Sequence, residues 1–251
     1  MCTASMEIVE SALANAESWS SEEVLQWASA RFEGQVAIAS AFGAEGIALL
    51  DIAAKIFRPL TVFTLDTGYL FPETRRLIVQ VEQRYGIQVE HVLPSLTPEA
   101  QETIHGTALW KRNPNLCCQI RKIEPLRKKL SGIRAWITAI RRNQTPARAN
   151  ARKVEWNTRF ECIKINPLVD WTEEMVWEYI RRHQLDYNVL HDRNYPSIGC
   201  MHCTRAIRPG EDGRAGRWAG FSKTACGLHE PASISENAPP SPALAASASH
   251  D

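Results

Sequence analysis

The chain has 251 residues, of which 44% are hydrophobic, and a formal net charge of +1. This length can bury one substantial core, as one large domain or as one domain with small additions, and no run reaches the roughly 18 uninterrupted apolar residues that a membrane helix needs. The N-terminus lacks the basic segment followed by an apolar run of a secretory signal. Seven cysteines without a regular disulfide framework fit a reducing compartment, so we expect a cytoplasmic protein.

The net charge of the chain is near zero, but its middle segment is strongly basic. Residues 111–164 hold 15 Lys and Arg side chains against three acids, whereas the segments on either side are net acidic. A localised basic region in a neutral protein predicts an anion site rather than a general nucleic-acid coat. No helix-turn-helix or RRM-like motif accompanies the charge, so we expect neither nucleic acid nor a membrane as a partner.

The first 33 residues predict two amphipathic helices, and Ser20–Glu23 carries the capping pattern of the second. Short apolar strands then alternate with helical stretches. This alternation predicts an α/β fold with a doubly wound, mostly parallel sheet and helices on both faces. The predicted strands lie at residues 36–39, 60–65, 89–93 and 135–138, and the helices between them at 44–56 and 72–85.

Two loops follow predicted strands at the edge where doubly wound sheets bind ligands. The first strand runs into Ser40–Gly46, where small residues let backbone N–H groups approach an anion at a helix N-terminus. The second strand ends in Leu65–Thr74, which contains Asp66. Asp66 is either a helix cap or a hydrogen-bond acceptor for a ribose or adenine edge.

Four cysteines form two pairs that packing does not require. Cys117 and Cys118 are adjacent, and Cys200 and Cys203 are spaced Cys-x-x-Cys. Adjacent cysteines cannot readily form a disulfide with each other without straining the peptide between them. Four thiolates from two distant pairs predict a metal site, and the spacing alone leaves a zinc ion and an iron–sulfur cluster about equally open.

The other three cysteines differ from one another. Cys226 lies among small and polar residues downstream of the pairs, where a lone thiol can be a nucleophile. Cys162 lies between Phe160 and Ile165 and is predicted to be a small buried hydrophobe. Cys2 is assigned no role. From Pro231 onward the composition falls to Pro, Ser and Ala, which predicts a disordered tail.

Several segments resemble, in order, the motifs of one family. Ser40–Glu45 resembles the modified phosphate loop of the adenylyl-sulfate and phosphoadenylyl-sulfate reductases, and Leu65–Thr74 resembles their second signature. Cys117–Lys122 resembles the Cys-Cys-x-x-Arg-Lys element of the iron–sulfur branch. The resemblance covers roughly residues 35–229, so the chain is identified as a member of the iron–sulfur-containing branch of the assimilatory reductases. Further similar blocks lie at residues 137–142, 164–168, 195–205, 210–218 and 223–229.

The resemblance implies an adenine-nucleotide alpha-hydrolase-like fold and thioredoxin-dependent reduction of adenylyl sulfate to sulfite and AMP, in sulfate assimilation and cysteine biosynthesis. The nucleophile would be Cys226, which forms an S-sulfocysteine that an external thiol, from thioredoxin or glutaredoxin, then resolves. A [4Fe-4S] cluster would be held by Cys117, Cys118, Cys200 and Cys203, and a homo-oligomer is allowed. The predicted substrate-binding residues are Ser40, Phe42, Gly43, Asp66, Thr67, Gly68, Lys122, Arg141, Arg148, Arg214 and Arg217.

Adenylyl sulfate is expected rather than its 3′-phosphorylated form, because cluster-containing members mostly use the unphosphorylated nucleotide. Residues 40–46 and 65–74 also contain three acids and no Lys or Arg. Reduction of phosphoadenylyl sulfate is one alternative. An ATP-pyrophosphatase or tRNA-thiolating enzyme is another, although Ser40–Gly43 poorly matches its Ser-Gly-Gly-type loop. A zinc-binding module that recognises nucleic acid is the non-enzymatic alternative.

The resemblance also predicts the domain organisation. An N-terminal helical region spans 1–33, a sulfonucleotide-binding α/β domain with the cluster site spans 34–210, a mobile segment with the catalytic cysteine spans 211–230, and a disordered tail spans 231–251. Gly46 and Ala225 stand where the family usually has acidic residues.

Overall fold

A six-stranded sheet forms the centre of the computed structural model, which describes residues 10–12, 15–221, 223 and 226–229. The strands lie in the order β3-β2-β1-β4-β6-β5, and only β5 is antiparallel to its neighbour. The predicted α/β fold with a mostly parallel sheet is therefore confirmed. The strands are Val36–Ala39 (β1), Val62–Leu65 (β2), Val89–Val92 (β3), Ala135–Ile137 (β4), Val154–Asn157 (β5) and Cys162–Ile165 (β6).

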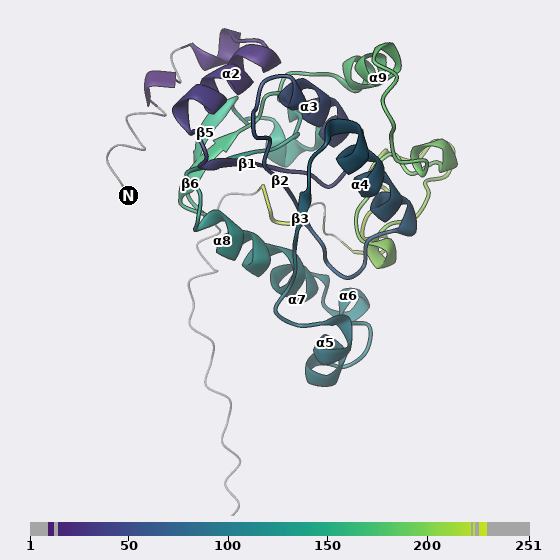
Figure 1. Cartoon of the computed structure of the whole chain (residues 1–251). Coiled ribbons are helices and arrows are strands. Elements are labelled where there is room, and N and C mark those ends of the chain that lie inside the picture. Colours follow the sequence, from purple (N-terminus) through teal and green to yellow (C-terminus); the bar gives the residue numbers. More distant parts are fainter. Residues whose placement is uncertain (1–9, 13–14, 222, 224–225, 230–251) are drawn as a thin grey trace, which may run out of the picture.

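Helices cover both faces of this sheet (Figure 1). Successive strand residues point to opposite faces, and accordingly Val36 and Ile38 pack in one apolar cluster while Ala37 and Trp136 pack in another. The second cluster joins the sheet to α8 (Glu124–Leu130). Because β1 is buried from both sides, its sequence is apolar throughout rather than alternating. The first cluster joins the sheet to α2 (Ser21–Arg31), α3 (Ala44–Ala54), α4 (Pro72–Tyr85) and α9 (Glu173–Arg182).

The N-terminal region carries the predicted helix cap. The hydroxyl of Ser20 accepts a hydrogen bond from the N–H of Glu23, and the carboxylate of Glu23 accepts one from the N–H of Ser20. This confirms the second predicted helix, α2. The first falls largely outside the described residues; within them, residues 10–12 are helical and a 3₁₀ turn follows at Ala16–Ser18. Cys2 and the predicted disordered tail at 231–251 also lie outside the described residues.

The sequence did not predict the hairpin of β5 and β6 at one edge of the sheet. Glu155 and Lys164 lie opposite each other there and form an ion pair of 2.8 Å. Such polar cross-strand pairs interrupt the apolar pattern from which the other strands were predicted. Cys162, predicted to be a buried hydrophobe, is 3% exposed in β6, which confirms that prediction.

The excursion between β3 and β4 carries the first pair of cysteines. It consists of α5 (Pro98–His105), α6 (Leu109–Arg112), α7 (Pro114–Cys118), a π-helical turn (Gln119–Ile123) and α8. After α9, the described chain forms only two short helical elements, which are 3₁₀ turns at His191–Arg193 and Met201–Cys203. The second turn lies at the Cys-x-x-Cys pair. None of the described helices has the length and hydropathy to cross a membrane.

The strand order places a topological switch point at β1 and β4. The chain runs from β1 outward to β2 and β3 on one side, and from β4 to β6 and β5 on the other. Ligands of doubly wound sheets bind in the crevice outside the carboxyl ends of such strands. The loops that follow β1 and β4 therefore face the same crevice.

Candidate active site

A cavity of about 500 Å³ opens at this switch point, and we call it the main cavity. Its wall is formed by the loops after β1, β2 and β4, by the end of the π-helical turn with α8, and by the chain after α9. Its volume lies in the range of small-molecule sites. It is lined by nine of the predicted catalytic and substrate-binding residues: Ser40, Gly43, Thr67, Lys122, Arg141, Arg148, Arg214, Arg217 and Cys226.

The loop after β1 turns sharply into α3. Phe42 has a left-handed backbone conformation with a φ of 56°, its N–H donates to Ser40 Oγ at 3.1 Å, and Gly43 is the N-cap of α3. A Cβ at Gly46 would lie 2.7 Å from Ser40 Oγ, so glycine lets the first turn of α3 approach the loop. A side chain at position 46 would therefore require Ser40 Oγ to shift.

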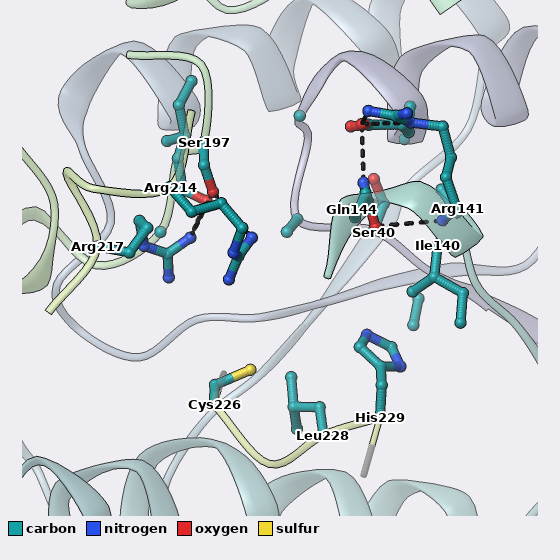
Figure 2. A pocket seen from close by; sticks show the side chains of 18 of the residues that line it. Ser40, Ile140, Arg141, Gln144, Ser197, Arg214, Arg217, Cys226, Leu228 and His229 are labelled. Carbon is teal, nitrogen blue, oxygen red and sulfur yellow. Dashed lines mark hydrogen bonds and ion pairs between the residues drawn. The ribbon is translucent and has the colours of Figure 1, made fainter. Parts of the chain in front are cut away.

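Two guanidinium groups converge on Ser197 at one end of the main cavity (Figure 2). Arg214 Nη1 and Arg217 Nη1 donate to Ser197 Oγ at 3.2 and 3.1 Å, and Arg217 also stacks on the Trp218 ring at 4.5 Å. Burial and the neighbouring Arg217 lower the pKa of Arg214 to about 10. Guanidinium groups held this close repel each other, and an oxyanion bound between them would relieve that repulsion.

Cys226 lies across the main cavity from these arginines (Figure 2). Burial raises the pKa of its thiol, but the ammonium of Lys122, the N–H of Leu228 and the guanidinium groups of Arg217 and Arg148 together lower the pKa below its ordinary value. A thiol with a lowered pKa in a cationic environment supplies a thiolate nucleophile.

The residues after Cys226 are docked against the sheet. Arg159 donates to the carbonyl of Gly227 at 2.6 Å, and Leu228 packs against the apolar cluster of Trp136. The ring of His229 stacks on Trp136 with a centroid distance of 5.7 Å. Burial and nearby cations lower the pKa of His229 well below its ordinary value, so the imidazole that lines the cavity is neutral.

A network of ion pairs and hydrogen bonds lies at the opposite end of the main cavity. Arg141 Nε and Nη2 each lie 3.0 Å from Glu45 Oε1, and Gln144 Nε2 donates to the same oxygen at 2.8 Å. The carbonyl oxygen of Gln144 accepts a hydrogen bond from Arg148. Gln144 therefore links Glu45 to a cation that also acts on the Cys226 thiol.

Three of the predicted substrate-binding residues, Phe42, Asp66 and Gly68, lie outside the wall of the main cavity. The Phe42 ring is fully buried in the core. The Asp66 carboxylate accepts hydrogen bonds from the N–H of Gly68 and from Arg75, and it also contacts His91. It therefore fixes the turn after β2, and the N-cap of α4 is Phe71 instead.

The four paired cysteines line a second, smaller cavity, the cysteine cavity, which adjoins the first. Lys122, Cys200 and Trp218 belong to the walls of both. Burial and neighbouring thiols raise the pKa of Cys117 to about 11 and that of Cys203 to about 12. The cysteine cavity thus brings together Cys117, Cys118, Cys200 and Cys203, and all four are free thiols.

The surroundings of the cysteine cavity fit an anionic group. Arg121 is 1% exposed, its Nη1 donates to the carbonyl of Thr67 at 2.8 Å, and its guanidinium lies over the Tyr69 ring at 4.6 Å. Its Nε and Nη2 have no hydrogen-bond partner within the described part of the chain. Buried donors left without an acceptor are rare and costly, and an anion in this cavity would supply one.

The donor set fits an iron–sulfur cluster, because four thiolates are the ligands of such a group and the four thiols share the wall of the cysteine cavity. Four thiolates are also the ligands of a structural zinc site. Among the described residues, no group of three or more His, Cys, Asp or Glu side chains is arranged to hold a single metal ion as it stands.

Sequence reasoning assigned no role to several polar residues of the main cavity, among them His229, Ser197, Glu45 and Gln144. His229, Ser197 and Glu45 lie in segments already recognised as motifs, so their positions were a usable signal. Gln144 gave no such signal, because its contact with Glu45 depends on β1 and β4 being neighbours in the sheet.

Comparisons with known proteins identify the family of the chain. Residues 35–206 match the profile of the phosphoadenosine phosphosulfate reductase domain. The chain is 50% identical to adenosine 5′-phosphosulfate reductase 2 of Bacillus subtilis (strain 168) over 209 residues, which cover 83% of this chain and 89% of that protein. The chain belongs to this reductase family. The family predicted from the motifs is therefore confirmed, and with it an oxidoreductase that acts on sulfur groups.

Other relatives extend the comparison. Adenosine 5′-phosphosulfate reductase of Shouchella clausii (strain KSM-K16) is 47% identical over 210 residues, 83% of this chain and 87% of that protein. The crystal structure of phosphoadenylyl-sulfate reductase from Candida auris, a phosphate complex, is similar with a TM-score of 0.69 and 30% identity over 78% of this chain and 95% of that chain. Yeast FAD synthetase shares the fold, with a TM-score of 0.53 and 13% identity over 74% of this chain and 66% of that chain.

Proposed function

We propose that the chain reduces adenylyl sulfate to sulfite and AMP in sulfate assimilation. The observation that carries this proposal is the position of Cys226, whose thiol has a lowered pKa and shares one cavity with several cations. Relatives named adenosine 5′-phosphosulfate reductase, at 47% and 50% identity, support the same substrate. The cations are Lys122, Arg148, Arg214 and Arg217.

The first step is a displacement at sulfur. The Cys226 thiolate attacks the sulfur of the sulfate group, the bond from that sulfur to the bridging oxygen breaks, and AMP leaves with the electron pair. The product on the protein is S-sulfocysteine. Lys122 and Arg217 act on the Cys226 thiol, and Arg214 lines the same cavity. These three cations would bind the sulfate oxygens, so that an anionic thiolate can approach an anionic group.

The second step needs an external dithiol. A thiolate of thioredoxin or glutaredoxin attacks the sulfur of Cys226, and sulfite leaves with the electrons of the broken sulfur–sulfur bond. The second thiol of the reductant then resolves the mixed disulfide and frees Cys226. The substrate thereby gains two electrons, and the reductant is oxidised to its disulfide.

A [4Fe-4S] cluster on Cys117, Cys118, Cys200 and Cys203 is the cofactor that we propose for the cysteine cavity. Its net negative charge would supply the acceptor that the buried Nε and Nη2 of Arg121 require. When bound, the group would supply structural and electrostatic support to the wall that both cavities share. Lys122 belongs to that wall and lies close enough to Cys226 to lower the pKa of its thiol.

The unphosphorylated nucleotide is the proposed substrate, and phosphoadenylyl sulfate is the alternative to be tested. Arg141, which the basic middle of the chain brings to the main cavity, is already paired with Glu45. A cytoplasmic location, the possible homo-oligomer and the division into an α/β domain at 34–210 and a mobile segment at 211–230 remain predictions.

Intact mass spectrometry of the full-length protein tests the proposal. With adenylyl sulfate and no reductant, the protein should gain one SO₃ group on Cys226 and release AMP in equal amount; thioredoxin should then release sulfite. Cys226→Ser should bind AMP but form no adduct, whereas the control Cys162→Ser should behave as wild type. An adduct on Cys162, or sulfite release by Cys226→Ser, would overturn the assignment.

A further inference from the structure

The two ends of the main cavity differ in their charge balance. Near Cys226, Lys122, Arg148 and Arg217 are close enough to lower the pKa of the thiol, and Arg214 adds a further cation. Around Arg141 three cavity-lining carboxylates offset the positive charge, those of Glu45, Glu173 and Glu174. Arg148 also reaches this end, where it donates to Gln144. Figure 2 shows Arg141 with Gln144 and Ser40 at one end, and Arg214 with Arg217 at the other.

Glu45 occupies the place where a phosphate would otherwise be favoured. It lies in the first turn of α3, directly after the glycine-containing loop that caps this helix, and a helix N-terminus of this kind attracts anions. Its Oε1 accepts hydrogen bonds from both Arg141 and Gln144, while its Oε2 has no donor among the described residues. The carboxylate therefore neutralises the cation and leaves an oxygen without a partner at the cavity wall.

The proposed reaction sets the orientation of the nucleotide. The sulfate must lie against Cys226, so the ribose extends away from the thiol, toward the end that holds Glu45 and Arg141. A 3′-phosphate on that ribose would add roughly two negative charges there. Arg141 is already paired with Glu45 and lies within 3.8 Å of Glu173, and Arg148 already donates to Gln144. Both guanidinium groups that the described residues bring to this end are therefore engaged before a phosphate arrives.

We infer that Glu45 is the residue that selects the unphosphorylated nucleotide by repelling a phosphate on the ribose. This inference rests on the proposed function and names what determines its substrate. An acid in the first turn of a helix can also be an ordinary partner of the helix dipole, as Glu73 is in α4. Glu45 differs from Glu73 because it lines the main cavity and pairs with a cation of that cavity.

The substitution Glu45→Gln separates charge from shape. Glutamine keeps a carbonyl oxygen that can accept from Arg141 and Gln144, so the network and the fold should survive while the negative charge is lost. The matched control is Glu73→Gln, the same change in the first turn of α4, where Glu73 pairs with Arg193 at 3.2 Å away from the main cavity. Thermal unfolding of each variant checks that the fold is retained.

Two measurements test the inference on the full-length holoenzyme. The first is kcat/KM for phosphoadenylyl sulfate relative to adenylyl sulfate, and the second is the Kd for adenosine 3′,5′-bisphosphate relative to AMP. Because like charges brought together across an interface cost several kcal/mol, Glu45→Gln should shift both ratios toward the phosphorylated nucleotide by about tenfold or more. Glu73→Gln should leave both ratios at the wild-type values.

Unchanged ratios in folded Glu45→Gln would overturn the inference. A further test uses only the wild-type protein: discrimination by repulsion must weaken as ionic strength rises, and discrimination that does not depend on salt would also overturn it. If wild type releases sulfite from neither nucleotide, the proposed function itself fails. If wild type prefers adenylyl sulfate and Glu45→Gln does so equally, only the role of Glu45 is wrong.

Discussion

The cysteine cavity and the main cavity place the same side chain in opposite electrostatic environments. Burial raises the pKa of Cys117 and Cys203, and neighbouring thiols raise it further by more than the nearby cations Arg121 and Lys122 lower it. Burial also raises the pKa of Cys226, but the cations around this thiol reverse the shift. Neighbouring charge, rather than burial, therefore distinguishes a thiol suited to be a ligand from one suited to be a nucleophile.

Lys122 joins the two environments. Burial alone would lower the pKa of its ammonium, but the neighbouring side chains of Cys200, Cys226 and Cys118 raise it above its ordinary value. One cation thus lies near the paired cysteines and near Cys226. Lys122 is four residues after Cys118, within the π-helical turn. Turns of this kind occur frequently at functional sites.

Replacing a thiol of the cysteine cavity should have the largest effect. Cys203→Ser should lower the iron content from about four atoms per chain to well below that, because four thiolates hold a cluster of this type. It should also destabilise the fold by more than about 3 kcal/mol, since ligand binding and folding are coupled in such sites. Iron analysis and denaturant unfolding of anaerobically purified protein measure both quantities.

Cys162→Ser is the matched control for that experiment. Cys162 is 3% exposed, more buried than the partly exposed Cys203, and lies in β6, where burial raises its pKa to about 12. Its replacement should leave the iron content unchanged. Full iron content in Cys203→Ser would remove that residue from the proposed ligands, and a stoichiometric zinc content in place of iron would reject the cluster.

The sequence predicted the residues that carry their chemistry in their type and spacing. Cys117 and Cys118, far from Cys200 in the chain, were assigned to one site, and the structure places all of them around one cavity. Residues whose role depends on a partner were not predictable in this way. Asp66 was predicted to bind the substrate because nothing in the sequence indicates that Arg75, one turn into α4, donates a hydrogen bond to its carboxylate.

The same distinction applies to the strands of the sheet. Strands β1, β2 and β4 are largely apolar runs and were found, whereas β5 and β6 carry the facing pair of Glu155 and Lys164 and were not. The link from Glu45 through Gln144 to Arg148 arises only when the loops after β1 and β4 meet. Such contacts follow from topology, which local patterns do not determine.

The next largest effect should be a difference in thiol reactivity. Because the pKa of Cys226 is lowered, its thiolate persists to lower pH, and alkylation by iodoacetamide should reach half its maximal rate below the value of about 8.5 typical of a free cysteine. The rate should fall as the pH falls through that pKa. Cys162, with a pKa raised to about 12, should stay unmodified in the folded protein.

Peptide mapping after brief alkylation at several pH values measures this contrast. The same protein in denaturant is the control, since both thiols should then react with the ordinary pKa. If the midpoint for Cys226 in the folded protein lies above that of the denatured protein, burial outweighs the cations and the comparison between the two cavities is wrong.

A smaller effect should follow from removing one cation of the main cavity. Arg217→Gln deletes a charge that lowers the pKa of Cys226, so the alkylation midpoint should rise, by about one pH unit. The control Arg193→Gln removes a guanidinium that pairs with Glu73 instead. The prediction requires a raised midpoint in the first variant and the wild-type midpoint in the second; equal midpoints would show that Arg217 does not act on the thiol.

The smallest predicted effect concerns the aromatic wall of the cysteine cavity. Trp110 lines this cavity, and its ring stacks on His202, which lies between Cys200 and Cys203 in the chain, at a centroid distance of 4.7 Å. The apolar shell around a metal site limits solvent access. Trp110→Leu should therefore keep the iron and the alkylation midpoint of Cys226 but accelerate the loss of the cluster's visible absorbance in air, by about two- to threefold.

Trp171→Leu is the control. It removes a ring that packs against Tyr179 with a centroid distance of 5.6 Å and that lines neither cavity. Equal rates of loss in the two variants would mean that Trp110 does not protect the site, whereas a shifted midpoint for Cys226 in Trp110→Leu would mean that the two cavities are coupled through more than Lys122.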